Sequence, residues 1–220
     1  MANDQMLAQM RDKPGFIAAL DQSGGSTPGA LRQYGIPDSA YSGDAEMFRL
    51  IHEMRVRIIS APAFTGEKVI GAILFEATMD GQAQGKPVPA FLWNERGVVP
   101  FLKVDKGLEA EAEQLLRDEL LEGLDALPAS QNVMIKLTIP DTPDFYLPLI
   151  EHPRVVRVVA LSGGYTRTDA CERLAKNHGM IASFSRALIN DLTKPMSDAG
   201  FDTALAASID EIWKASVQKV

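Results

Sequence analysis

Short apolar runs recur along the chain and alternate with stretches in which apolar residues return at helical spacing. Such runs are typical of parallel strands that are covered on both faces. The sequence therefore predicts six strands, at Gly15–Leu20, Val69–Phe75, Val98–Val104, Val133–Leu137, Val155–Leu161 and Met180–Phe184. Strands that alternate with helices indicate an α/β fold built on a parallel sheet.

Helix signals lie between these strands. A hydroxyl residue precedes a proline at Thr27–Pro28 and at Thr142–Pro143, the order expected of an N-cap and a first helical turn. Thr166 and Asp169 have the spacing of a capping box. Two apolar stripes at helical spacing predict helices that pack on the sheet, one through Met47, Ile51, Met54 and Ile58 and one through Leu108, Ala112, Leu116, Leu120, Leu124 and Leu127.

The 220 residues, 46% of them hydrophobic and 23% charged, suit one soluble globular domain that spans 1–220. A net charge of −7 without any Lys/Arg block argues against nucleic acid and anionic membranes as main partners. The apolar runs are too short to span a membrane, and the N-terminus lacks the pattern of a signal peptide. A single cysteine, Cys171, fits a reducing compartment, so we expect a cytoplasmic protein.

A lysine stands inside one of the predicted buried strands. Lys136 lies within the apolar run Val133–Leu137, where an ammonium group is costly. Desolvation lowers the pKa of a lysine, and the neutral amine is a nucleophile that condenses with carbonyl compounds. The alternative is a structural lysine whose stem carries the charge out to solvent.

Charged residues follow two other predicted strands. Asp21 comes directly after Leu20, where its carboxylate can deprotonate a substrate hydroxyl or cap a loop amide. Period-two alternation places Lys103 and Asp105 on one side of their strand, with Lys106 beyond its end. Inside a barrel, this pair would set the charge near Lys136, whereas at an exposed edge it would be an ordinary surface pair.

The last two predicted strands end in groups suited to an anion. Ser162, Gly163 and Gly164 follow one strand and precede a capped helix, so backbone amides can approach a phosphate at the helix N-terminus. Arg186 follows the other strand and offers a planar fork for phosphate oxygens. The two together resemble the phosphate sites of parallel barrels.

The three histidines, His52, His152 and His178, lack the spacing of metal ligands, so no metal site is predicted. Neither the glycine fingerprint of a dinucleotide-binding fold nor a P-loop is present. The chemistry is therefore expected to need no cofactor.

Taken together, six segments of this chain resemble class I fructose-bisphosphate aldolase in its bacterial form. They are Gly15–Ser26, Gly71–Glu76, Phe101–Gly107, Met134–Pro140, Leu161–Tyr165 and Ser183–Leu188, and they occur in the family's order over nearly the whole chain. The resemblance implies an eight-stranded (β/α) TIM barrel, a lyase that forms a Schiff base, and a sugar phosphate as substrate.

The resemblance also implies roles for particular residues. Lys136 matches the Schiff-base lysine, and Asp21 matches the aspartate that acts on the C4 hydroxyl of the substrate. The lysine–aspartate motif that surrounds the site corresponds to Lys103, Asp105 and Lys106. The groups that grip the C1 phosphate correspond to Ser162, Gly163, Gly164 and Arg186, and Ser23 is expected to bind substrate phosphate as well.

The chain departs from the family after Gly107. The family continues through a fourth strand with a lysine–methionine–arginine motif and a fifth with glutamate–proline–glutamate. Here Leu108 leads straight into a predicted helix, Glu109–Leu127, so we predict an internal deletion of about two strand–helix units near 108–110. The six remaining strands can form a smaller barrel, remain an open sheet or pair with a second copy of the chain.

These observations predict the aldol cleavage of fructose 1,6-bisphosphate to dihydroxyacetone phosphate and glyceraldehyde 3-phosphate, a step of glycolysis. One alternative is an impaired relic that binds sugar phosphates or serves as a structural or regulatory partner. A second is a related Schiff-base enzyme, such as a deoxyribose-phosphate aldolase or a transaldolase.

Overall fold

The computed structural model describes residues 2–22, 25–102 and 113–220, and this part of the chain contains six parallel strands. They are β1 (Phe16–Leu20), β2 (Val69–Leu74), β5 (Val99–Leu102), β6 (Val133–Thr138), β7 (Val155–Leu161) and β8 (Ile181–Ala182). All six strands predicted from the apolar runs are confirmed. A two-residue antiparallel hairpin, β3 (Gln82–Ala83) with β4 (Lys86–Pro87), was not predicted.

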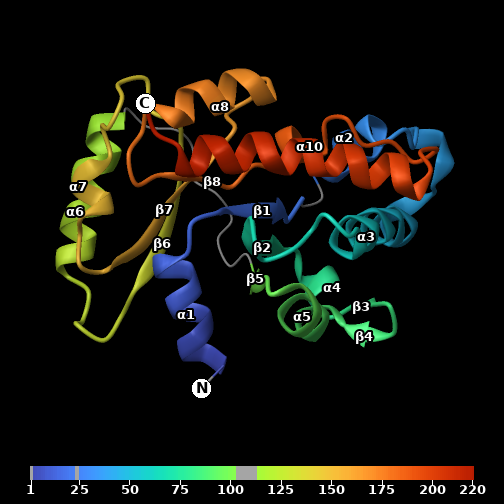
Figure 1. Cartoon of the computed structure of the whole chain (residues 1–220), viewed down its shortest axis with the longest axis horizontal. Helices are drawn as coiled ribbons and strands as arrows, with labels where there is room; N and C mark the ends of the chain where they lie inside the picture. The colour runs from blue at the N-terminus through green and yellow to red at the C-terminus, as the bar shows by residue number, and fades with distance from the viewer. Residues whose placement is uncertain (1, 23–24, 103–112) are drawn as a thin grey trace.

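The strands form two parallel sheets that meet side by side. One sheet has the order β1-β2-β5 and the other β6-β7-β8. The backbone N–H of Ala19 donates to the carbonyl of Phe184 at 3.3 Å, which joins β1 to the segment after β8. The strands therefore follow one another in the curved row β5-β2-β1-β8-β7-β6 (Figure 1).

Helices connect the strands and cover the outer face of this row (Figure 1). Their bounds are α1 (Ala2–Asp12), α2 (Thr27–Gln33), α3 (Gly43–Ser60), α4 (Glu76–Met79), α5 (Val88–Phe91), α6 (Glu113–Asp125), α7 (Leu147–Ile150), α8 (Arg167–Ala175), α9 (Arg186–Ile189) and α10 (Asp198–Val217), with a 3-10 turn at Asp38–Ala40 and a π turn at Leu92–Arg96. The long helix α10 lies across the strands and contacts β1, β8, α8 and α9.

The structure tests the predicted helix starts. Thr166 caps α8 as predicted, since its Oγ1 accepts a hydrogen bond from the N–H of Asp169 at 3.2 Å. Thr27 is instead the first residue of α2, and Ser26 precedes it. The start predicted at Thr142 is wrong, because Asp144 has a φ of 61° that no α-helix accommodates, so α7 begins only at Leu147.

The apolar stripe of α3 is confirmed, since Met47, Ile51, Met54 and Ile58 are all buried. In the other predicted stripe, Leu116, Leu120, Leu124 and Leu127 pack against the same core, while Leu108 and Ala112 lie outside the described residues. Both stripes belong to one apolar layer between the strands and the helices.

A second, smaller core fills the concave side of the row. Side chains from five strands meet there with Met10 of α1, and the cluster comprises Met10, Ile17, Ile70, Val99, Val159 and Ile181. Arg157 of β7 donates hydrogen bonds to the carbonyls of Met10 at 2.8 Å and Lys13 at 3.1 Å. These contacts hold α1 against the N-terminal ends of the strands. The carboxyl ends of the strands lie at the opposite end of the row from α1.

The row does not close into a barrel. Its two end strands are β5 and β6, and among the described residues no strand connects them. Leu102, at the end of β5, is 44% exposed, and β6 is only half-buried over Val133, Met134 and Ile135. Of the three arrangements considered from the sequence, the structure has the open row of six strands.

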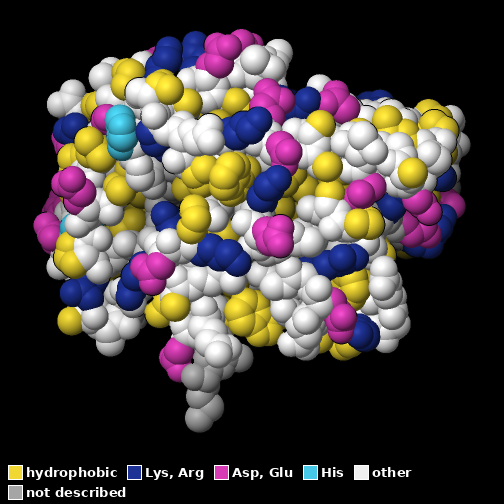
Figure 2. Space-filling model, in the orientation of Figure 1, with side chains coloured by type: hydrophobic (Ala, Val, Ile, Leu, Met, Phe, Trp, Pro, Cys, Tyr) yellow, Lys and Arg dark blue, Asp and Glu magenta, His cyan; other side chains and the backbone are white. Residues whose placement is uncertain are grey.

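The sequence argues against nucleic acid and anionic membranes as main partners, and the surface charge and the helices of the structure can be compared with that expectation. On the face shown in Figure 2, basic and acidic side chains are interspersed and do not gather into a patch of one sign. Within the described ranges, no helix is long and apolar enough to cross a membrane.

The buried Cys171 provides a test of this packing. It is 7% exposed in α8, and burial raises the pKa of its thiol to about 12. Since the thiolate is the reactive form, the native protein should react with a thiol reagent at pH 8 at least about a hundredfold more slowly than the unfolded chain. Stopped-flow measurement with and without denaturant checks this on the single thiol of the chain.

The raised pKa also predicts a pH dependence. Above pH about 9, the unfolded chain releases the Cys171 proton that the folded chain keeps, so the thiol's contribution to stability is lost as the pH rises towards about 12. Denaturation of the wild type and of Cys171→Ala, measured across this pH window, should show the difference in their free energies of unfolding falling as the pH rises. A difference that stays constant with pH would contradict the burial of the thiol.

Candidate active site

Four of the predicted site residues lie in or just after four neighbouring strands. Asp21 follows β1, Arg186 follows β8, Ser162 follows β7, and Lys136 lies within β6. Because these strands are parallel and consecutive in the row, their carboxyl ends form one continuous rim. The structure therefore places on neighbouring strands, from distant parts of the sequence, four of the positions that the resemblance singled out.

Lys136 lies on the concave face of β6. It is in register with Val159 of β7, a member of the inner core, and Met134 two residues earlier packs against the same cluster. Neighbouring positions in register point to the same side of a sheet, so Lys136 faces the concave side.

The prediction that Lys136 is buried is wrong. Its residue is exposed, because β6 is an end strand whose outer edge no described strand covers. Burial in an apolar strand therefore supplies no argument for the reactivity of this amine. Its position on the concave face of the rim supplies the argument instead.

Asp21 lies half-buried at the end of β1, two residues after Ala19 and on the same side of the strand as Ile17 of the inner core. Its charge acts on Arg55 of α3, whose pKa burial lowers to about 10 and the Asp21 carboxylate raises. The carboxylate therefore lies near a buried cation.

The turn after β7 has a left-handed backbone at both of its glycines. Ser162 is 8% exposed, and the N–H of Tyr165 donates to its carbonyl at 3.0 Å. Gly163 and Gly164 are exposed and have φ values of 59° and 88°, a left-handed conformation that glycine adopts readily. The turn leads into α8, and its residues lie one strand away from the exposed Arg186 at the start of α9.

Sequence reasoning missed two residues beneath the rim, Arg55 and Gln22. Arg55 is 1% exposed and donates hydrogen bonds to Gln22 and Thr78. The signal was present in α3, where Arg55 comes directly after Met54 of the buried stripe and four residues after Ile51. An arginine beside a buried stripe indicates a guanidinium with partners inside the protein.

Four predicted site residues and the expectation about metals remain to be compared with the structure. Ser23, Lys103, Asp105 and Lys106 lie outside the described residues. Within 2–22, 25–102 and 113–220, no three His, Cys, Asp or Glu side chains are arranged to hold a metal ion.

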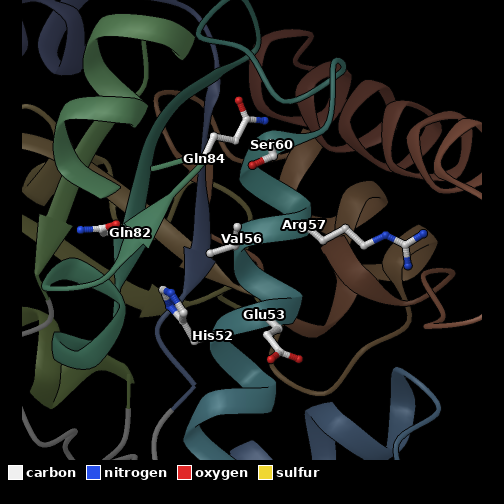
Figure 3. Close-up of a pocket in the computed structure, with 7 residues that line it drawn as sticks. All are labelled: His52, Glu53, Val56, Arg57, Ser60, Gln82 and Gln84. Atoms are coloured by element: carbon white, nitrogen blue, oxygen red, sulfur yellow. The ribbon is translucent and has the colours of Figure 1, made fainter. Parts of the chain in front are cut away.

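A pocket of about 440 Å³ lies away from the rim, between α3 and the β3–β4 hairpin. Figure 3 shows its lining, which contains none of the predicted site residues: His52, Glu53, Val56, Arg57, Ser60, Gln82 and Gln84. The guanidinium of Arg57 points away from the hairpin and donates to the carbonyls of Lys194 and Met196. A second pocket of similar volume, beside α8, also contains none of them.

The glycine turn yields a prediction. An alanine Cβ at Gly164 would meet no heavy atom within 4 Å, so Gly164→Ala tests backbone conformation alone. At a φ of 88°, it should destabilise the fold by about 1–2 kcal/mol. Gly123→Ala in α6, which is also surrounded by open space, should instead stabilise by about 0.5–1 kcal/mol. Urea denaturation decides, and two changes of the same sign would contradict the left-handed turn.

Comparison with known proteins places the chain in a family. No model of a protein family matches it. A curated protein from Synechocystis sp. named fructose-bisphosphate aldolase class 1 is 40% identical over 293 residues, covering 98% of each chain. One of the same name from Porphyromonas gingivalis is 40% identical over 294 residues, covering 98% of this chain and all of the relative. Both alignments are longer than the 220 residues here, so part of each relative has no counterpart in this chain.

A solved structure agrees on the fold. The fructose-bisphosphate aldolase of Plasmodium falciparum, in complex with TRAP and a small molecule inhibitor, superposes with a TM-score of 0.62 at 14% identity and covers 98% of this chain and 94% of that one. With two relatives at 40% identity over nearly the whole length, the chain belongs to the class I fructose-bisphosphate aldolase family.

Proposed function

We propose that this protein cleaves fructose 1,6-bisphosphate to dihydroxyacetone phosphate and glyceraldehyde 3-phosphate through a Schiff base on Lys136. Membership of the aldolase family supports the reaction. The observation that carries the assignment is the position of Lys136 on the concave face of β6, on the same rim as the Ser162–Gly164 turn and Arg186. A primary amine and an anion cradle on one rim suit a phosphorylated ketone.

The phosphate groups orient the substrate. The C1 phosphate accepts hydrogen bonds from the backbone amides of the Ser162–Gly164 turn and pairs with the guanidinium of Arg186. Ser23 and Lys106 are assigned to the phosphates by family resemblance. With C1 held at β7 and β8, the C2 ketone is directed towards Lys136 on the adjacent strand.

Covalent chemistry follows at C2. The neutral amine of Lys136 adds to the ketone, and loss of water gives an iminium ion that withdraws electrons from C3. Asp21 accepts the proton of the C4 hydroxyl as the C3–C4 bond breaks, which releases glyceraldehyde 3-phosphate and leaves an enamine. Protonation at C3 and hydrolysis of the iminium then release dihydroxyacetone phosphate and restore the lysine.

The internal deletion lowers the expected rate. The family motifs missing after Gly107 include a second lysine and a pair of glutamates that move protons, and a lost acid or base group typically costs about 10²–10⁴-fold. Lys103 and Asp105 are proposed to set the remaining charge near the amine. We therefore expect an aldolase that turns over slowly.

A second candidate function is a protein that binds sugar phosphates without turnover. The exposure of Lys136 favours it, because water around an amine keeps the charged form favourable. Under either function, we propose a cytoplasmic protein. The two open strand edges, β5 and β6, make association with a second copy the further expectation.

Borohydride trapping tests the mechanism. Reduction in the presence of fructose 1,6-bisphosphate should convert the iminium into a stable adduct that peptide mass spectrometry places on Lys136. Lys136→Ala should abolish the adduct and lower turnover by at least about 10²-fold. The matched control is Lys86→Ala, which removes a surface lysine paired with Glu95 at 2.5 Å and should leave both readouts unchanged.

An adduct on another lysine, or full turnover in Lys136→Ala, would contradict the mechanism. Binding of fructose 1,6-bisphosphate without adduct or turnover in the wild type would favour the second candidate function.

A further inference from the structure

The side chain of Gln22 connects two loops of the rim. It is 5% exposed at the end of β1, and its Nε2 donates a hydrogen bond to Oγ of Ser185 at 2.8 Å. Ser185 precedes α9, whose first residue is Arg186. The residue before Gln22 is Asp21. The Gln22 carboxamide therefore links the loop that carries Asp21, the proposed proton acceptor, to the loop that carries Arg186, the proposed phosphate ligand.

A buried guanidinium fixes the orientation of this carboxamide. Arg55 donates to Oε1 of Gln22 from Nε at 3.2 Å and from Nη2 at 3.1 Å, and also to the backbone carbonyl of Gln22 at 2.6 Å. Since a guanidinium only donates, the oxygen of the carboxamide must face Arg55. The amide nitrogen is thereby directed to Ser185, whose hydroxyl oxygen accepts.

Arg55 is itself anchored to the segment that follows a third strand, β2. Its Nη1 donates to Oγ1 of Thr78 at 2.8 Å, in the short helix α4 that follows β2. Thr78 is fully buried, and the Arg55 guanidinium lies 5.8 Å from the ring centre of Phe75. The chain of hydrogen bonds from Thr78 through Arg55 and Gln22 to Ser185 thus spans the ends of β2, β1 and β8 inside the protein, where such bonds hold geometry more firmly than in water.

From these contacts we infer that Gln22 is a positioning residue, which Arg55 orients and which fixes the spacing between Asp21 on β1 and Arg186 after β8. The inference rests on the proposed function for the identity of the ligand, a sugar bisphosphate. It adds that correct phosphate binding depends on a hydrogen bond that touches no substrate atom. The link also crosses the junction at which the two sheets meet.

Ser185→Ala tests the link at little structural cost. Ser185 makes no side-chain capping bond to α9, so the substitution removes the acceptor for Gln22 and leaves the helix start unchanged. The probe is a hexitol 1,6-bisphosphate, in which the C2 ketone is reduced. It carries both phosphates and cannot form an iminium, so calorimetry reports binding independently of Lys136.

We expect Ser185→Ala to weaken binding of the hexitol bisphosphate by about three- to tenfold, the range of one net hydrogen bond. Gln22→Met should weaken it at least as much. The double variant should bind no more weakly than Gln22→Met alone, because both changes remove the same link. Independent, multiplying losses would overturn the inference.

Ser216→Ala, in α10, is the matched control. Its buried hydroxyl accepts a hydrogen bond from the N–H of Ala182, the last residue of β8, at 3.0 Å, and it is not bonded to Gln22 or Arg55. It should lower the stability of the fold more than Ser185→Ala does and leave binding of the bisphosphate unchanged. If Ser185 had a purely structural role, the variant that lowers stability more, Ser216→Ala, would also weaken binding more.

The outcomes separate the inference from the proposed function. Wild-type affinity in Ser185→Ala, or a wild type that does not bind the hexitol bisphosphate, overturns the inference. Weakened binding in Ser185→Ala together with failure to trap an adduct on Lys136 supports the inference and removes the catalytic mechanism. Trapping on Lys136 together with unchanged binding in Ser185→Ala supports the catalytic mechanism and overturns the inference about Gln22.

Discussion

The junction between β1 and β8 is the constraint on which the arrangement of the site depends. The hydrogen bond from the N–H of Ala19 to the carbonyl of Phe184 places the two three-stranded sheets in one row. The strand ends that carry Asp21 and Arg186 then become neighbours. The buried bonds of Arg55 and Gln22 cross the same junction one step nearer the rim, so the sheet contact and the geometry of the site reinforce each other.

The open side of the row has the opposite consequence. A parallel strand needs a neighbour on each edge to satisfy its backbone, and β6 has β7 on one side only among the described strands. Lys136 consequently faces the concave side of the row but lacks the apolar cover that was expected to tune its amine. The alignment supports the same picture, since relatives of this family contain a segment with no counterpart here.

The features that could be predicted from the sequence are those that depend on residues close together in the chain. The six strands followed from apolar runs, and the start of α8 followed from Thr166, whose cap depends on residues within one turn. The exposure of Lys136 could not be predicted, because it depends on which strand lies beside β6. Asp144 adopts a left-handed backbone while it binds Asn177 and His178, partners that a local pattern does not reveal. Arg55 was visible as a charge beside an apolar stripe, but its partners, Gln22 and Thr78, come from the segments that follow β1 and β2.

The central claim is that the amine on β6 and the phosphate cradle of β7 and β8 serve one substrate molecule. A crystal structure of the protein reduced with borohydride in the presence of fructose 1,6-bisphosphate tests it most directly. The account predicts continuous density from Nζ of Lys136 to C2 of the sugar, with the C1 phosphate on the Ser162–Gly164 turn and against Arg186. A phosphate bound elsewhere, such as between α3 and the β3–β4 hairpin, would contradict it.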